Sequence, residues 1–158
     1  MTAQDIVHRL ETRGESLAVA ESLTGGALAS AIVDVPGASK VFRGAVVAYQ
    51  LPVKTSLLSV PAAMLEEHGA VSAPVAEAMA TGAQRALEAT WAVAATGVAG
   101  PDPDPQTGLE AGTVVISVAG PGGVVVTEKA VFVGNRAEIR VQTVEKALEL
   151  LNSALERE

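Results

Sequence analysis

Apolar residues recur at helical spacing near both ends of the chain. Positions three and four residues apart are apolar over residues 2–13, which predicts an amphipathic helix there. A second stripe of this kind follows Asn135, and Glu138 stands three residues later, which is the spacing of a capping box. A last helix is therefore expected to begin at Asn135 and to bury its apolar face.

Runs of Ala, Val and other apolar residues, bounded by Gly, Pro or polar residues, predict buried strands. Three of these runs cover residues 16–20, 41–50 and 91–100. Two β-branched runs, at 113–119 and 124–133, flank a short glycine-rich connection and predict a β-hairpin. Helical spacing returns between the strands, at residues 24–33, 52–58, 61–68 and 73–88.

This order of elements predicts an α/β fold. The first three strands are separated by helices and need crossover connections, which favours parallel pairing, whereas the last two form an antiparallel hairpin. We expect a three-layer α/β/α sandwich with a mixed, mostly parallel sheet of about five strands that ends in a β-hairpin. A chain of this length suits one core, so residues 1–158 are expected to form a single domain.

Composition narrows the classes of function. Hydrophobic residues make up 49% and aromatic residues 3% of the chain, so the core must be aliphatic. The net charge of −7 argues against nucleic acid and membranes as partners. The chain has no cysteine, which excludes disulfides, a thiolate nucleophile and the common structural zinc sites. Its first residues carry charges throughout and lack an apolar targeting segment, so we expect a soluble, cytoplasmic protein.

Three loops that follow predicted strands carry the candidate chemistry, because the carboxyl ends of parallel strands converge on one crevice. The first loop contains Ser22, Thr24, Gly25 and Gly26. Its paired glycines would let a ligand approach the backbone, and free amides at the start of the following helix would bind an anion. The alternative is that Ser22 or Thr24 only caps that helix.

The second loop offers Tyr49 and Lys54, a phenol and an amine five residues apart, although a lysine taken alone is more often a solvated surface residue. The third loop contains Thr96, Gly97 and Gly100. Its glycines allow a tight backbone path to a ligand, and a purely structural turn is the alternative. Both histidines of the chain lie in predicted helices without a metal-ligand or catalytic pattern around them.

In their order along the chain, these segments resemble the C-terminal domain of competence/damage-inducible protein A (CinA), in a form without the domain that is often fused before it. The resemblance covers nearly the whole chain and rests on several ordered matches. The matching segments are AESLTGG (20–26), DVPGAS (34–39), Tyr49 followed by Lys54, GAVS (69–72), ATGVAGP (95–101), GTV (112–114) and the pair Arg136 and Arg140.

Enzymatic members of that family are nicotinamide-nucleotide amidases. The resemblance therefore implies hydrolysis of the carboxamide of nicotinamide mononucleotide to nicotinate mononucleotide and ammonia, in salvage of the NAD precursor, with no metal and no cofactor. Ser22 matches the nucleophile, Lys54 the base beside it and Tyr49 a supporting residue. Contacts to the pyridine mononucleotide are expected from Thr24, Gly25, Gly26, Thr96, Gly97, Gly100, Arg136 and Arg140.

Two segments depart from the family pattern. Gln50 and Leu51 stand where members usually carry Ser or Thr and then Asn, and residues 102–105 read Asp-Pro-Asp-Pro instead of Asp-Gly-Gly and a Thr-Pro pair. Two alternatives therefore stay open: a module that binds a nucleotide without turning it over, and a serine amidase for another small carboxamide. An aliphatic domain with many small residues could also pair helices in a homodimer.

Overall fold

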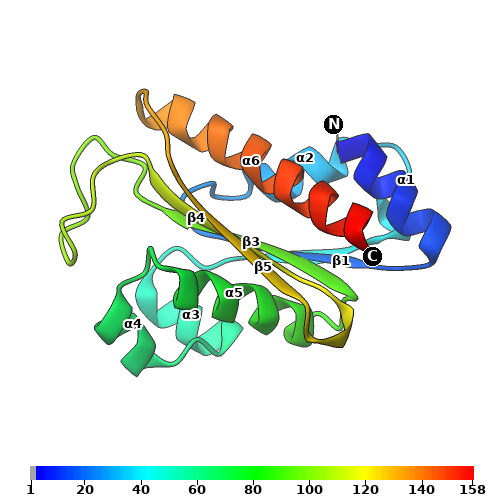
Figure 1. Ribbon diagram of the computed structural model, residues 1–158, viewed down its shortest axis with the longest axis horizontal. Helices are drawn as coiled ribbons and strands as arrows, with labels where there is room; N and C mark the ends of the chain where they lie inside the picture. Colours follow the sequence, from blue (N-terminus) through cyan, green and yellow to red (C-terminus); the bar gives the residue numbers. More distant parts are fainter. Residues whose placement is uncertain (1–2) are drawn as a thin grey trace.

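Five strands form the central sheet of the computed structural model, which describes residues 3–158 (Figure 1). They are β1 (Leu17–Glu21), β2 (Phe42–Val47), β3 (Trp91–Gly97), β4 (Thr113–Ala119) and β5 (Val125–Val131). Their order across the sheet is β2-β1-β3-β4-β5. β1 pairs in parallel with β2 and β3, whereas β4 pairs in the antiparallel direction with β3 and β5. The predicted mixed sheet with a C-terminal hairpin is therefore confirmed.

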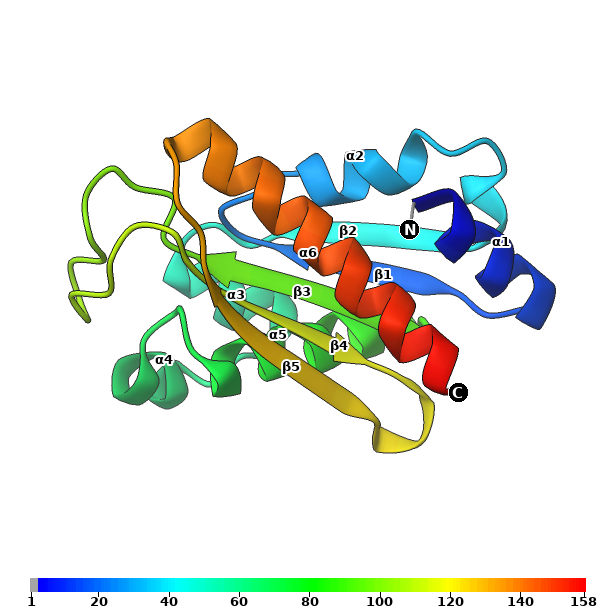
Figure 2. The ribbon, with the colours of Figure 1, turned by 45° about the horizontal axis from the view of Figure 1, so that its top comes forward.

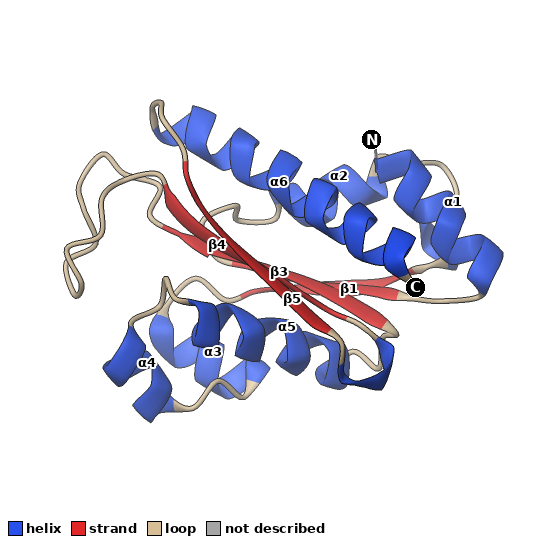
Figure 3. Cartoon of the chain, in the orientation of Figure 1, coloured by secondary structure: helices blue, strands red, loops and turns tan. Residues whose placement is uncertain are grey.

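Helices cover both faces of this sheet (Figure 3). One face carries α1 (Ala3–Arg13), α2 (Ala27–Val33) and α6 (Arg136–Arg157). The other carries α3 (Leu51–Leu58), α4 (Ala62–His68) and α5 (Ala73–Ala86). The long helix α6 runs across β3 and β4, while α2 lies over β1 and β2 (Figure 2). These layers confirm the predicted α/β/α sandwich, and no helix in the described part of the chain combines the length and apolar character needed to cross a membrane.

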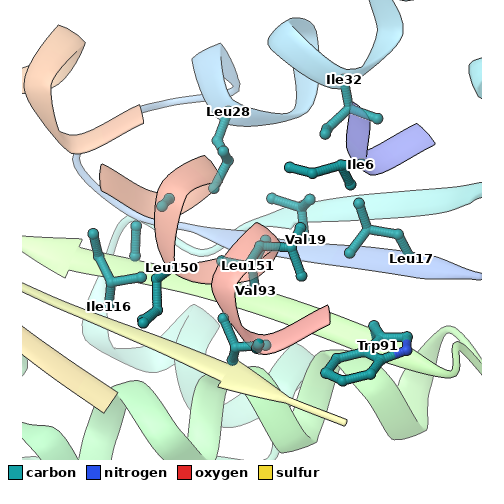
Figure 4. Close-up of a cluster of buried hydrophobic side chains, with 14 of the residues drawn as sticks. Ile6, Leu17, Val19, Leu28, Ile32, Trp91, Val93, Ile116, Leu150 and Leu151 are labelled. Atoms are coloured by element: carbon teal, nitrogen blue, oxygen red, sulfur yellow. The ribbon is translucent and has the colours of Figure 1, made fainter. Parts of the chain in front are cut away.

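Side chains of different size line the two faces of the central strands, because successive residues of a strand point to opposite faces. Leu17 and Val19 of β1, with Trp91 and Val93 of β3, belong to a large cluster under α1, α2 and α6 (Figure 4). Full burial of each such side chain contributes ~1.5–3 kcal/mol. The alanines between them belong to a second cluster with Leu58 and residues of α5. Small side chains on that face let α3 and α5 pack close to the strands.

The boundaries of three elements, α2, β2 and β3, differ most from the sequence expectation. α2 begins at Ala27 rather than near Thr24, because Gly25 and Gly26 adopt left-handed backbone conformations, with φ of 59° and 106°, that a right-handed helix does not accommodate. β2 and β3 also end a few residues earlier than expected, where the chain turns into α3 and into the loop before β4. Both differences fall at the carboxyl edge of the sheet, where the candidate loops lie.

The starts of α6 and α5 differ in how they are capped. The capping box of α6 is confirmed: Asn135 Oδ1 accepts from the Glu138 amide at 2.9 Å, and Glu138 Oε1 accepts from the Asn135 amide at 3.2 Å. Ser72 occupies the N-cap position of α5, but its hydroxyl donates to the Gly69 carbonyl at 2.8 Å and does not bond to the helix amides.

Candidate active site

A cavity of about 530 Å³ lies at the carboxyl ends of β1, β2 and β3, where ligands bind in open α/β sheets. Its volume falls in the range of small-molecule sites, ~300–1,000 Å³. Its walls come from the turn after β1, the connection from β2 into α3, the turn before α5, the loop after β3 and the start of α6. The predicted site residues in its lining are Ser22, Tyr49, Lys54, Thr96, Gly97, Gly100 and Arg136.

Ser22 is the first residue after β1, and its backbone is held on both sides. The Ser22 amide donates to the Ala95 carbonyl of β3, and the Ser22 carbonyl accepts from the Gly25 amide, both at 3.1 Å. The residue is only 8% exposed while it lines the cavity. The N-cap residue of α2 is Gly26, the Ser22 hydroxyl contacts Lys54 and the Thr24 hydroxyl donates to Glu21, so the alternative that Ser22 or Thr24 is a helix cap is wrong.

Lys54 reaches the same cavity from α3 and is 1% exposed, so the alternative of a solvated surface lysine is also wrong. Its Nζ lies 3.3 Å from Ser22 Oγ, 2.7 Å from the Ala48 carbonyl oxygen and 3.1 Å from the Tyr49 carbonyl oxygen. Burial removes water from the ammonium group and lowers the pKa of Lys54 from 10.5 to about 8. The neutral form of Lys54 is therefore far more populated near physiological pH than it would be at the ordinary pKa of 10.5.

The three neighbours of Lys54 Nζ define what this amine can do. A neutral amine has two N–H donors and one lone pair. When the two N–H bonds point at the carbonyls of Ala48 and Tyr49, the lone pair is left for the Ser22 hydroxyl. The arrangement can therefore take a proton from Ser22 and produce a serine nucleophile.

Tyr49 and Arg136 form a bridge across the mouth of the cavity. Arg136 Nη2 donates to the Tyr49 hydroxyl at 3.0 Å, and Arg136 Nη1 donates to the Gly100 carbonyl at 2.6 Å. The bridge joins the end of β2, the loop after β3 and the start of α6, which are far apart in the sequence. Tyr49 is 56% exposed, so its ring faces the opening, while its carbonyl contacts Lys54.

The amino-acid sequence matches the family model described as the CinA C-terminal domain over residues 1–155. The chain belongs to this family. Curated relatives named CinA-like protein include one from Anaeromyxobacter sp. (strain Fw109-5), 48% identical over 151 residues, and one from Frankia casuarinae, 47% identical over 146 residues. The alignments cover 95% and 92% of this CinA domain but 36% and 33% of the relatives, so the chain spans about a third of their length.

Solved structures of CinA superfamily proteins share the fold of this CinA domain. The crystal structure of the protein from Klebsiella pneumoniae 700603 has a TM-score of 0.94 at 31% sequence identity and covers 99% of this chain and 96% of its own. That of the competence/damage inducible protein from Agrobacterium tumefaciens has a TM-score of 0.91 at 35% identity, with 98% and 93% covered. The resemblance inferred from the ordered motifs is therefore confirmed.

The last residues of β3, Thr96 and Gly97, also line the cavity in this CinA domain. Thr96 is buried, and its hydroxyl donates to the Ala70 carbonyl at 2.9 Å, which holds the turn before α5 against the cavity. Gly97 has a packing reason to be glycine, since a Cβ there would lie 2.8 Å from Val114 Cγ2 and 3.0 Å from the Thr113 carbonyl oxygen. The end of β3 is thus constrained by its packing and also faces the site.

Four predicted substrate contacts lie outside the cavity lining: Thr24, Gly25, Gly26 and Arg140. The expected free amides at the start of α2 are also not available. The side chain of Glu21, which the sequence reasoning left out, accepts from the amides of Gly26, Leu28 and Ala29. Substrate contact by the four residues stays a prediction. In the structure they bond to the Glu21 carboxylate and to backbone carbonyls of residues 22–24.

A signal for Glu21 was present in the sequence. It ends the apolar run of β1 directly before Ser22, and a carboxylate at the end of a fully buried strand needs several hydrogen-bond donors close by. Two glycines and a helix start follow within six residues and offer those donors. Among the described residues, no group of three or more His, Cys, Asp or Glu could hold a metal ion.

Proposed function

We propose that this CinA domain hydrolyses the carboxamide of nicotinamide mononucleotide to nicotinate mononucleotide and ammonia. The observation that carries the proposal is the buried contact between Lys54 Nζ and Ser22 Oγ, 3.3 Å apart in the cavity wall. Amide hydrolysis needs an activated nucleophile, and a lysine with a lowered pKa can activate a serine. Membership of the CinA family supports this substrate and a role in salvage of the NAD precursor in the cytoplasm.

The proposed reaction has two halves and uses neither a metal nor a cofactor. Ser22 Oγ attacks the carboxamide carbon while neutral Lys54 Nζ takes the hydroxyl proton. The tetrahedral intermediate then breaks its C–N bond, and Lys54 returns the proton to the nitrogen, which leaves as ammonia. In the second half, a water molecule attacks the carbonyl carbon of the Ser22 ester and gives a proton to Lys54. The ester C–O bond then breaks, Lys54 passes the proton to Ser22 Oγ, and the product leaves as a carboxylate.

Other groups near Ser22 and Lys54 could stabilise the intermediate and bind the phosphate group of the substrate. The negative oxygen of the intermediate needs hydrogen-bond donors, and the backbone amides of Leu23 and Ala99, two cavity-lining residues, are candidates for it. Arg136 is the cation at the mouth, and a planar guanidinium suits a phosphate group. Tyr49 keeps Arg136 in place through the hydroxyl contact.

Ammonia release by two variants tests the proposal. We expect Ser22→Ala and Lys54→Met each to lose more than about 99% of turnover, and the double variant to be little worse, because residues that act as one unit are not additive. Ser39→Ala and Lys40→Met, outside the cavity lining, are matched controls that should keep the wild-type rate. The nucleophile assignment is wrong if Ser22→Ala keeps more than about a tenth of the activity, a loss in barrier terms below ~1.4 kcal/mol.

A specific observation favours a second candidate, a serine amidase for a small carboxamide without phosphate. Asp102 and Asp104 line the same cavity as Arg136, and two carboxylates in the cavity oppose a phosphate group. The same Ser22 and Lys54 chemistry would then serve another substrate. Comparison of nicotinamide riboside with the mononucleotide separates the two: an equal KM for both would favour the second candidate.

A further inference from the structure

The loop that carries Ser22 is held from inside by a buried carboxylate. Glu21 is fully buried, and it is the residue directly before Ser22. Its carboxylate gathers donors from the loop and from the first turn of α2. Its oxygens accept from Thr24 Oγ1 at 2.6 Å and from the amides of Gly26 at 3.1 Å, Leu28 at 2.9 Å and Ala29 at 3.0 Å.

The same loop is held from outside by a guanidinium from the other end of the chain. Arg140 of α6 donates from Nε to the Leu23 carbonyl and from Nη2 to the Thr24 carbonyl, both at 2.9 Å. The Glu21 carboxylate therefore accepts hydrogen bonds from N–H groups of the loop and of the first turn of α2, and the Arg140 guanidinium donates hydrogen bonds to carbonyl groups of the loop. Hydrogen bonds to charged groups contribute more to stability than bonds between neutral groups.

We propose that Glu21 and Arg140 are positioning residues, which together hold the Ser22 hydroxyl against Lys54. The proposal rests on the proposed function, since it assigns them to the serine nucleophile of that reaction. Neither residue lines the cavity, so both act through Ser22 and not on the substrate. This assignment is an alternative to the expectation from the sequence that Arg140 contacts the nucleotide.

The geometry explains why the Ser22 loop needs both Glu21 and Arg140 to hold it. Gly25 and Gly26 have left-handed backbone conformations, and residues of this kind leave the loop with little stiffness of its own. The Ser22 Oγ to Lys54 Nζ distance of 3.3 Å is near the upper limit of a hydrogen bond, so a further shift of about 1 Å would break the contact. A displacement of that size at a reacting group lowers a rate about a hundredfold.

The two roles possible for Arg140 predict different kinetics. A positioning residue lowers kcat and leaves KM nearly unchanged, because the substrate contacts remain. A residue that binds the phosphate of the substrate raises KM instead. Arg140→Lys distinguishes the two roles, because a single ammonium group cannot reproduce the two hydrogen bonds that Arg140 makes from Nε and Nη2.

The experiment measures ammonia release from nicotinamide mononucleotide for Glu21→Gln, Arg140→Lys and the double variant, well below each melting temperature. The control for Arg140→Lys is Arg13→Lys, because Arg13 Nη2 also donates to a backbone carbonyl, that of Leu155, but away from the cavity. The control for Glu21→Gln is Glu15→Gln, because Glu15 also accepts a hydrogen bond from an N–H group, Nε1 of Trp91, but away from the cavity. Ser22→Ala is measured alongside.

We expect kcat to fall at least about tenfold in each single variant, with KM within about threefold of wild type. The double variant should lose less than the product of the two single effects, because both residues hold one loop. The midpoint of the pH dependence should stay near the wild-type value, since Lys54 is unchanged. Both controls should keep kcat, even where they lower the melting temperature.

Three results would overturn the inference, and they can be distinguished. If Ser22→Ala abolishes turnover while folded Arg140→Lys and Glu21→Gln keep the wild-type kcat, the positioning role of Glu21 and Arg140 is wrong and the proposed function stands. If Arg140→Lys mainly raises KM, Arg140 is a substrate contact and the positioning role is wrong. If Ser22→Ala keeps its turnover, the proposed function is wrong and the inference falls with it. Should Glu21→Gln fail to fold, Arg140→Lys decides alone.

Discussion

Lys54 carries a group that water solvates strongly, yet 1% of the residue is exposed. Two backbone carbonyls and the Ser22 hydroxyl replace the lost water. They do so incompletely, and the pKa falls to about 8. A residue that is unfavourable for folding as an ammonium ion thereby becomes a base close to physiological pH.

Catalysis should follow the titration of Lys54. Only its neutral form takes the Ser22 proton, so kcat/KM for nicotinamide mononucleotide should rise with pH and level off above about 8. Below that value each pH unit should lower kcat/KM about tenfold. Initial rates between about pH 6 and pH 10 measure this. A flat profile, or one that falls as the pH rises through this range, would contradict the assignment of Lys54 as the base.

Stability should respond to the same titration. The folded pKa of about 8 lies below the ordinary 10.5, so between these values the unfolded chain binds more protons and the free energy of unfolding rises with pH. Relative to Lys54→Met, the wild type should gain about 1.4 kcal/mol per pH unit across this window. The gain is fully present above 10.5 and is lost as the pH falls through about 8. Urea unfolding of both proteins at several pH values measures it, and parallel curves would contradict it.

At the scale of elements, α3 can present Lys54 only because α5 lets it come close. A Cβ on Gly82 of α5 would overlap the carbonyl oxygen of Leu58 at the end of α3. Leu58 lies one turn after Lys54, so a shift of this helix end moves the base. Glycine at this position therefore supports both the packing of the helices and the site.

Gly82→Ala should destabilise the protein by about 1–3 kcal/mol, because the steric overlap outweighs the ~1 kcal/mol that alanine contributes to a helix. It should also lower kcat. Thr81→Ala is the matched control on the same helix, since Thr81 Oγ1 donates to the carbonyls of Glu77 and Ala78 within α5. This control should change the free energy of unfolding by less than ~0.5 kcal/mol. Thermal unfolding and kcat measure both variants, and full stability of Gly82→Ala would contradict the packing argument.

The first two turns of α6 supply one arginine to the mouth of the cavity and another to the loop of Ser22. Arg136 and Arg140 are four residues apart and therefore lie on one face of the helix. Arg136 reaches the mouth of the cavity, whereas Arg140 reaches the loop of Ser22. The capping box of Asn135 and Glu138 sets where this helix begins and so fixes the position of both arginines.

At the scale of the whole molecule, charge decides which partners can approach. The chain has a net charge of −7, and each duplex phosphate would add repulsion. Although relatives carry names that refer to competence and damage, we expect no binding of duplex DNA tighter than about 100 μM at about 50 mM salt. Fluorescence anisotropy with a labelled duplex measures this, and salt-dependent binding in the micromolar range would contradict the expectation.

The type and order of the elements were determined by the sequence itself. Helical and strand periodicities arise from local backbone geometry and from the burial of one face, and both are visible within a dozen residues. For this reason the five strands, the hairpin and the capping box at Asn135 were predicted. Ser22 and Lys54 could be paired only through the resemblance to a family, because each alone also suited a cap or a surface residue.

The tertiary structure decided what those side chains contact. Burial of Lys54 and its contact with Ser22 join residues 32 positions apart, and Arg140 reaches Leu23 across 117 positions. Such contacts depend on how whole elements pack, since the solvent around a group and its charged neighbours are set by distant segments. The start of α2 at Ala27 and the role of Glu21 have the same origin: a buried carboxylate and two left-handed glycines together outweigh the local helical pattern.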